Sequence, residues 1–342
     1  MSSIAGNIAP SDFLPIQPTT LVYPIILFAS IIMFVYWLLK KSRYALIYAV
    51  IFIVSFGQIK RNFQFTITGS SEKKVEDTKL LSYNVKNFDE REIKPTITST
   101  RNEIIDFLKE ENSDIVCLQE YHSTNKKLYE PIKDIRDTLS MTSYYYESYY
   151  NPKYNQLLGL VTFSKYKAVN KGKLKFEGSR SFGIYTDLII NGDTIRVFNI
   201  HLASIKLLPS DLDFVTNPEA ENTQQFRNQA TDIYFKLTEA YSLREKQMDY
   251  LTKIIDSTKY KILLCGDFND TPSSWVYKQI SSYLRDTYVS KGNGISRTYA
   301  GPIPFLRIDY ILTSNTFKTL SYKRIKKNMS DHYPITAIIS SD

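Results

Sequence analysis

Several apolar segments of this chain end in polar residues whose types suit acid–base chemistry and cation binding. The clearest is Cys265–Pro272 (CGDFNDTP), which closes an apolar run and presents Asp267 and Asn269. A turn accounts for these residues equally well, because Gly, Asp, Asn and Pro are the commonest turn formers. A rigid strand end is also where catalytic carboxylates and amides are held. This segment alone leaves both interpretations open.

The ends of other expected strands carry similar residues. They are Asn84 in LSYNV, Glu120 in CLQE, His201 in NIHL, Asp309 in RIDYI, and Asp331 with His332 in SDHYPI. The chain has only three histidines, and two of them belong to this set. Taken singly, each residue is explained as a loop acid, a turn or a buried structural histidine. Together they predict one site gathered at the ends of several strands.

In this order the motifs resemble the endonuclease/exonuclease/phosphatase superfamily, also called deoxyribonuclease-I-like. GDFN and SDH are its specific motifs, whereas LSYN, LQE and RIDYI are weak singly but occur in the right order. GLVTFSKY (Gly159–Tyr166) and the residues Arg244 to Gln247 also match. The resemblance runs from about Lys79 to Ile339. It implies hydrolysis of a phosphoester, with nucleic acid or phospholipid as the substrate classes to consider.

The residue types predict the same chemistry. In-line attack of water on a phosphoester builds negative charge that must be neutralised. Glu120 offers a carboxylate to a hard cation and Asn84 lies close by to orient it, so we expect Mg²⁺, with Mn²⁺ as the alternative. His332 is expected as the base because imidazole titrates near neutrality. Asp309 is expected to hold and polarise His332, as a carboxylate does in other triads.

The remaining site residues have expected roles around the phosphate. Asp267 is expected to orient the attacking water, and Asn269 to donate to a phosphate oxygen. His201 is expected to contact the phosphate or assist the leaving oxygen, and Asp331 to orient the network or contact a second metal. The residues expected to line a substrate groove are Tyr149, Tyr150 and Arg180.

Short apolar runs alternate with polar helical stretches from Thr78 onward. Strands are expected at Lys79–Val85, Ile115–Leu118, Leu158–Phe163, Tyr185–Ile190, Thr194–Leu202, Tyr260–Cys265, Ile308–Leu312 and Ile335–Ile339. Helices are expected at Ser99–Glu111, Thr223–Asp256 (either continuous or broken) and Ser273–Leu284. Many strands with few crossover helices predict an α+β fold, a four-layer αββα sandwich in which two packed mixed β-sheets are flanked by helices, over residues 78–342.

The N-terminus differs from the rest of the chain. Two uncharged runs, 21–39 and 44–59, are separated by KKSR. They predict a transmembrane helical hairpin within an anchor of residues 1–60, followed by a linker at 61–77. A signal peptide fits less well, because the first 20 residues contain no Lys or Arg and no small-residue cleavage site follows. The charges between the runs favour an integral membrane protein with an extracytoplasmic catalytic domain, although Lys60 and Arg61 oppose this.

The composition of the chain excludes few classes of function. The net charge of +8 is compatible with a phosphate-bearing substrate, but no dense Lys/Arg stripe for tight duplex binding is present. Cys117 and Cys265 lie in apolar runs and are expected to be small buried residues rather than a disulfide or metal pair. A catalytically inactive, membrane-bound binding module and a secreted soluble nuclease are the alternative functions. No protein partner can be inferred.

Overall fold

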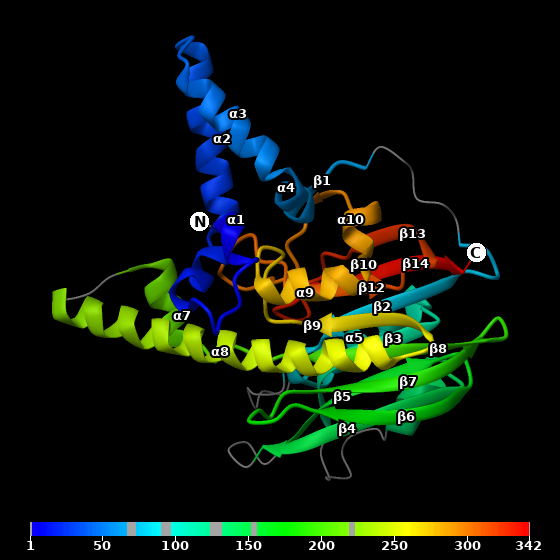
Figure 1. Ribbon diagram of the computed structural model, residues 1–342. Helices are drawn as coiled ribbons and strands as arrows, with labels where there is room; N and C mark the ends of the chain where they lie inside the picture. The colour runs from blue at the N-terminus through cyan, green and yellow to red at the C-terminus, as the bar shows by residue number, and fades with distance from the viewer. Residues whose placement is uncertain are drawn as a thin grey trace.

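Two six-stranded β-sheets pack face to face in the computed structural model (Figure 1). The structure describes residues 2–66, 73–89, 97–123, 132–151, 156–218 and 223–341. The first sheet has the order β13 (Phe317–Arg324), β14 (Ile335–Ser341), β2 (Thr78–Asn84), β3 (Ile115–Ser123), β5 (Gln156–Ser164) and β4 (Ser143–Asn151). The second has the order β10 (Arg285–Asp286), β12 (Asp309–Thr313), β9 (Lys261–Asp267), β8 (Asp193–His201), β7 (Phe182–Ile190) and β6 (Ala168–Lys175).

Each sheet is mixed and has one parallel pair at its centre. β2 pairs with β3 in the first sheet and β8 pairs with β9 in the second, and every other pairing is antiparallel. A parallel pair requires a crossover. In chain order, helix α5 (Ile97–Glu111) follows β2 and precedes β3. Helices α7 (Pro209–Thr216) and α8 (Thr223–Ser257) follow β8 and precede β9. The carboxyl ends of each parallel pair therefore meet at one edge of their sheet.

Three apolar layers hold the sheets and helices together. The layer between the sheets includes Cys117 and Cys265, which are both free and buried, as predicted. A second layer lies under α8 and α9 (Trp275–Tyr283). A third lies under α5 and α6 (Ile132–Thr138). This arrangement confirms the predicted α+β fold with two mixed sheets flanked by helices.

The predicted elements are present with shifted bounds, and α8 is one continuous helix. The sequence prediction missed strands β4, β6 and β13 and the short strand β10. It also missed helices α6, α7 and α10 (Thr287–Lys291) and the 3-10 turn η2 (Lys86–Asp89). These four strands lie at the outer positions of the two six-stranded sheets. The two-residue strands β1 (Phe63–Gln64) and β11 (Gly294–Ile295), which the sequence also did not predict, pair with each other outside those sheets.

The N-terminal region forms a helical hairpin that projects from the sheets (Figure 1). Its elements are α1 (Ser2–Ala5), η1 (Leu14–Thr20), α2 (Tyr23–Leu39), α3 (Tyr44–Val54) and α4 (Phe56–Asn62). Helices α2 and α3 lie side by side, with the rings of Phe34 and Phe52 in edge contact at 5.4 Å. Most of the large apolar side chains of both helices are exposed.

The second uncharged run is not one helix, because α3 ends at Val54 and the chain bends at Ser55. Among the described residues, no single helix is long and apolar enough to cross a membrane. Two bent pairs pass that test together, η1 with α2 and α3 with α4, and each pair is bent by 66°. After α4, the short strand β1 (Phe63–Gln64) pairs with β11 (Gly294–Ile295), so the segment that we interpret as a linker starts with paired residues.

Candidate active site

The predicted site residues meet where the central strands end. Asn84 is the last residue of β2, His201 the last of β8 and Asp267 the last of β9. His201 and Asp267 are register partners in the parallel pair. Glu120 lies beside them on β3, next to Gln119, the register partner of Asn84. The topology alone thus brings together four side chains that are far apart in the sequence.

Asp309 and His332 reach the same place from strands that run the opposite way. Asp309 begins β12 directly opposite Asp267, and His332 lies just before β14. The Nδ1 atom of His332 lies 2.9 Å from Oδ2 and 3.1 Å from Oδ1 of Asp309. Its Nε2 atom lies 3.7 Å from Oδ2 of Asp267. Asp309 therefore fixes the imidazole ring so that Nε2 faces the second carboxylate.

Carboxylates and amides form a compact cluster around this pair. The Asn84 side-chain amide donates to Oδ2 of Asp267 at 2.9 Å and to Oε1 of Glu120 at 3.4 Å. Nε2 of His201 lies 3.7 Å from Asp267 Oδ2 and 3.9 Å from Glu120 Oε1. Asp267 is buried, whereas Glu120 and His201 are partly exposed. The cluster thus has a buried floor and an open side.

Unusual backbone conformations aim these side chains. Glu120 has a left-handed φ of 50° at a register shift in the pairing of β3 with β5, and bulges of this kind redirect side chains near functional sites. Asn269 has a φ of 53°, and Gly266 a φ of 141°. A Cβ atom on Gly266 would lie 2.0 Å from the carbonyl oxygen of Ile200, so this position requires glycine. The left-handed conformations of Glu120 and Asn269 cost energy and persist where the surrounding structure supports them, whereas glycine adopts a positive φ freely.

Asn269 and Asp331 complete the predicted set in different ways. The backbone N–H of Asn269 donates to Oδ1 of Asp267 at 2.8 Å, and its side-chain amide donates to the carbonyl of Leu202 at 3.1 Å. An amide nitrogen carries two protons, so one further donor of Asn269 is available to a substrate. The Asp331 carboxylate lies at the rim, 3.9 Å from Nζ of Lys86, and not within the buried cluster.

Burial and charge shift the pKa values of the two central groups. Burial raises the pKa of the Asp267 carboxyl to about 6, and the neighbouring Asp309 adds to the rise while His332 opposes it. Burial alone would lower the pKa of His332, but the negative charges of Asp309 and Asp267 outweigh it and raise the pKa to about 10. Of these two groups, His332, which lies between the two carboxylates, therefore holds its proton more tightly.

The donor set fits a hard divalent cation. Ligand atoms of Asp267, Asp309 and His332 lie within 4.8 Å of one another. Both oxygens of Asp309 face His332, so this part of the group forms a hydrogen-bonded couple. Glu120 and Asp267 offer carboxylate oxygens around the Asn84 amide, and oxygen ligands are those that Mg²⁺ and Mn²⁺ accept. The chemistry of the residues is thus compatible with the predicted metal.

Sequence reasoning assigned no role to two residues that support the site. Arg244 on α8 is fully buried and donates from Nη1 to the carbonyl of Asn269 at 2.6 Å. Tyr299 forms a β-bridge with His332, and their rings are in edge contact at 5.7 Å. Arg244 belongs to one of the matching segments of the sequence, but no sequence signal showed that its charge is buried. Tyr299 lies in a loop with no distinguishing pattern.

A groove of about 600 Å³ opens beside the cluster and includes Glu120 and His201 in its wall. Of the residues expected there, Tyr149 and Arg180 line it, whereas Tyr150 does not. Lys206 and Phe182 also contribute, so the wall offers both positive charge and aromatic surface.

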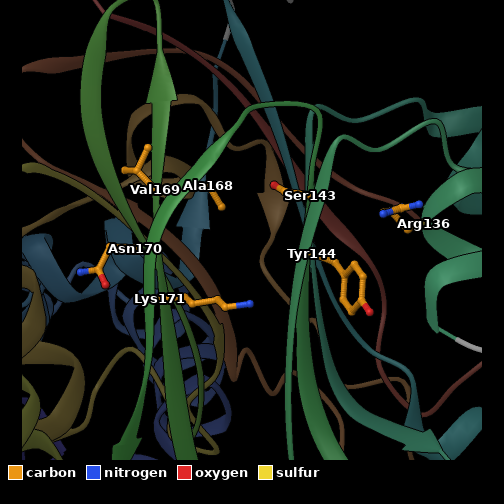
Figure 2. Close-up of a pocket in the computed structure, with 7 residues that line it drawn as sticks. All are labelled: Arg136, Ser143, Tyr144, Ala168, Val169, Asn170 and Lys171. Carbon is orange, nitrogen blue, oxygen red and sulfur yellow. The ribbon is translucent and has the colours of Figure 1, made fainter.

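A separate depression of about 340 Å³ lies between α6, β4 and β6, and Figure 2 draws the side chains that line it. It is lined by Arg136, Ser143, Tyr144, Ala168, Val169, Asn170 and Lys171. No predicted site residue lies in this depression, and we assign it no role.

The two-sheet fold and the acid–histidine cluster are those expected from the family that the sequence motifs resemble. Residues 81–332 match the Endonuclease/Exonuclease/phosphatase family, and the chain belongs to that family. Its members are hydrolases that act on phosphoester bonds and typically depend on a divalent metal. Residues 1–62 match a domain of unknown function. No curated protein gives a significant sequence match.

Solved structures share the fold at low sequence identity. An endonuclease/exonuclease/phosphatase from Beutenbergia cavernae is 15% identical with a TM-score of 0.56, covering 78% of this chain and 72% of that one. The human Nocturnin catalytic domain with bound sulfate is 16% identical with a TM-score of 0.55, covering 79% and 97%. ANGEL2, a 2′,3′-cyclic phosphatase in complex with adenosine-2′,3′-vanadate, is 15% identical with a TM-score of 0.53, covering 80% and 99%. At these identities the comparisons support the fold alone.

Proposed function

We propose that this protein is a membrane-anchored, divalent-metal-dependent phosphoester hydrolase. The observation that carries the proposal is the His332–Asp309 couple, whose Nε2 atom faces Asp267 at 3.7 Å in a cluster that also holds Glu120 and Asn84. A module that only binds has no need for a buried histidine fixed between carboxylates. The cluster therefore favours an enzyme over the catalytically inactive alternative.

We assign the roles in hydrolysis to particular residues of this chain. Asp267 and His332 lie together on the floor of the site, where Asp267 orients the attacking water. Because the pKa of His332 is raised to about 10, the imidazole is protonated near neutral pH, so the ionised Asp267 carboxylate receives the proton of the water in place of the expected His332. Asp309 holds Nδ1 of His332 and keeps the ring in place. Asn269 donates its remaining amide proton to a phosphate oxygen, and His201 contacts the phosphate or the leaving oxygen from the open side.

A divalent cation would be held chiefly by Glu120. Asn84, which we also predict as a ligand, would bind it only through Oδ1, which accepts from the backbone N–H of Lys86 at 3.0 Å in this structure, while its amide N–H donates to Glu120. When bound, the cation would neutralise the negative charge that develops on the phosphate oxygens. We assign Mg²⁺ to this position, with Mn²⁺ as the alternative, because the ligands are oxygens and few in number.

The groove supports a substrate with an organic group attached to the phosphate. Arg180 and Lys206 supply positive charge, and Tyr149 and Phe182 supply aromatic surface. Nucleic acid and phospholipid both satisfy these requirements. The Nocturnin structure holds a bound sulfate and the ANGEL2 structure holds adenosine-2′,3′-vanadate, and a nucleotide is therefore among the substrates to test here.

A metal and substrate screen tests this function. Purified full-length protein is assayed with DNA, RNA, phosphoinositides, sphingomyelin and a generic phosphodiester, with Mg²⁺ or Mn²⁺ and with EDTA. We expect activity that EDTA abolishes and that Glu120→Gln lowers by at least about 100-fold, because a charged ligand contributes several kcal/mol to charge neutralisation. The control is Glu110→Gln, which changes an exposed carboxylate of α5. Activity that survives EDTA, or a fully active Glu120→Gln variant, would contradict the metal assignment, and inactivity on every substrate would favour the binding module.

The N-terminal hairpin supports the membrane anchor. Apolar side chains such as Phe28, Ile32 and Leu46 are exposed on α2 and α3, and a contiguous apolar surface of this kind needs a lipid or protein cover. Helix α2 has 17 residues, a length of about 25 Å, to which flanking Lys and Arg side chains can add by reaching the interface.

Contacts at both ends of the hairpin indicate on which side of the membrane the catalytic domain lies relative to those ends. Thr20 precedes α2 and contacts α8, while Asn62 ends α4 and accepts from the Tyr288 hydroxyl at 3.3 Å. Both ends of the hairpin therefore rest on the catalytic domain, which must lie on the same side of the bilayer as both ends. The charges of Lys40, Lys41 and Arg43 favour the extracytoplasmic side for that domain.

An engineered cysteine tests this topology. Ser71→Cys introduces a thiol in a segment outside the described residues, and the native cysteines are buried. We expect a membrane-impermeant maleimide to label this variant in intact cells. Labelling that requires permeabilisation would reverse the topology, and protein recovered in a detergent-free soluble fraction would favour the secreted nuclease.

A further inference from the structure

The segment before the hairpin packs on the catalytic domain. Ala5 is fully buried, and Ala9 packs against the apolar layer under α8 and α9. Gly6 approaches the loop before α9 so closely that a Cβ atom would lie 2.7 Å from the carbonyl oxygen of Ser273. The hydroxyl of Ser11 donates to Glu245 on α8 at 2.5 Å. Residues 2–20 thus belong structurally to the catalytic domain.

Thr20 is the residue through which this segment reaches the active-site loop. It is fully buried, and its hydroxyl donates to the carbonyl of Gln17 at 2.7 Å. The same hydroxyl lies 3.2 Å from the hydroxyl of Tyr241 on α8. The carbonyl oxygen of Thr20 accepts from the hydroxyl of Thr271 at 3.2 Å. Thr271 belongs to the CGDFNDTP segment, two residues after Asn269.

Tyr241 continues this contact to Arg244. The guanidinium of Arg244 lies 4.5 Å from the centre of the Tyr241 ring. Its Nη1 atom donates to the carbonyls of Asn269 at 2.6 Å and Ala203 at 3.3 Å, and its Nε atom lies 3.1 Å from Oδ2 of Asp270. Arg244 and Asp270 are both buried, so the pair is rigidly placed and its partners are fixed with it.

The loop that receives these contacts needs external support. Asn269 has a left-handed φ of 53°, a conformation that side chains disfavour and that asparagine tolerates better than most residues, so contacts from neighbouring segments help to hold it. Its N–H orients Asp267 by donating to Oδ1 at 2.8 Å. A change in the backbone at Asn269 therefore moves both the amide and the carboxylate that the proposed chemistry uses.

We propose that residues 2–20 are a positioning element of the active site, acting through Thr20, Tyr241 and Arg244 on the loop at Asn269. This inference rests on the proposed hydrolase function only for its catalytic consequence. It gives residues 1–62, which match a domain of unknown function, a role beyond attachment. Since Thr20 lies three residues before α2, it also connects the proposed membrane anchor to the loop at Asn269.

Thr20→Val tests this role in the full-length protein, because it keeps the shape of the side chain and removes its hydroxyl. Thr238→Val is the matched control. Thr238 is buried on α8 and makes the same local bond, to the carbonyl of Phe235 three residues earlier, at 2.9 Å. Tyr241→Phe removes the same contact from the other side and keeps the ring beneath Arg244.

Two measurements are made on each variant: hydrogen exchange of the peptide that covers residues 266–272, and kcat and KM on the substrate found in the screen. We expect Thr20→Val and Tyr241→Phe to speed exchange in this peptide several-fold and to lower kcat about fivefold, the size of one neutral hydrogen bond, at unchanged KM. Thr238→Val is expected to leave both unchanged.

Three outcomes overturn the proposal. They are wild-type exchange of the loop in both Thr20→Val and Tyr241→Phe, an equal effect of Thr238→Val, and a loss confined to the melting temperature. The exchange measurement needs no substrate. If the wild-type protein proves inactive, the hydrolase function fails while loop exchange still decides whether residues 2–20 position the loop.

Discussion

The charge state of His332 offers a direct test of the geometry of the site. Its pKa is raised from 6.5 to about 10, mainly by Asp309 and Asp267 against the effect of burial. Asp309 contacts Nδ1 through both oxygens, at 2.9 and 3.1 Å. A hydrogen bond to a charged group contributes about 1.5 to 3 kcal/mol, so Asp309→Asn is expected to lower the pKa of His332 by about 1 to 2 pH units.

Histidine NMR of the chelator-treated protein measures this pKa. The chain has only three histidines, so ring signals can be assigned with a His332→Gln variant. Asp331→Asn is the matched control, because its carboxylate lies at the rim beside Lys86 and has the smallest effect of the charges that raise the pKa. A wild-type His332 that titrates near 6.5 would refute the reasoning, as would equal shifts in the Asp309 and Asp331 variants.

The same shift predicts a dependence of stability on pH. Because the pKa of His332 is higher in the folded protein than in the unfolded protein, its contribution is complete below pH 6.5 and is lost as the pH rises through about 10. The full contribution is about 5 kcal/mol, and about 2 to 3 kcal/mol of it is lost between pH 7 and 9. Chemical denaturation of the wild type against His332→Gln isolates this term. A difference between the two proteins that stays constant from pH 7 to 9 would contradict it.

Two further predictions concern the couple and the strand end. His332→Ala and Asp309→Ala are each expected to lower kcat at least about 100-fold, and the double variant to lose far less than the product of the two, because the residues act as one unit; multiplicative losses in a kinetic assay would disprove the couple. Gly266→Ala is expected to cost at least about 2 kcal/mol in free energy of unfolding, because the added Cβ would lie 2.0 Å from the carbonyl oxygen of Ile200. Gly57→Ala, where nothing lies within 4 Å, is the control, and equal stability of both variants would show that the loop can adapt.

The sequence alone predicted the central strands and named the candidate residues that the structure brings together at the ends of these strands. Central strands are buried on both faces, so runs such as Tyr260–Cys265 and Thr194–Leu202 are apolar enough to be recognised. The sequence did not predict the outer strands β4, β6 and β13, because strands at a sheet edge are less buried and therefore less apolar. Segments such as SYYYESYYN and AVNKGKLK lie at sheet edges and carry polar or aromatic residues on faces that the core does not cover.

Only the tertiary structure decided how the site residues meet and what supports them. Asn84 and Asp267 are 183 residues apart, and their contact at 2.9 Å exists because two parallel strand pairs end at the same edge of the packed sheets. Thr20 and Tyr241 are 221 residues apart, and neither residue type differs from an ordinary buried polar residue in the sequence. The left-handed conformations of Glu120 and Asn269 arise from strand pairing and from contacts such as that of Arg244. A local sequence pattern shows which residues are present. The contacts that orient their side chains come from segments far away in the sequence, which only the complete fold brings together.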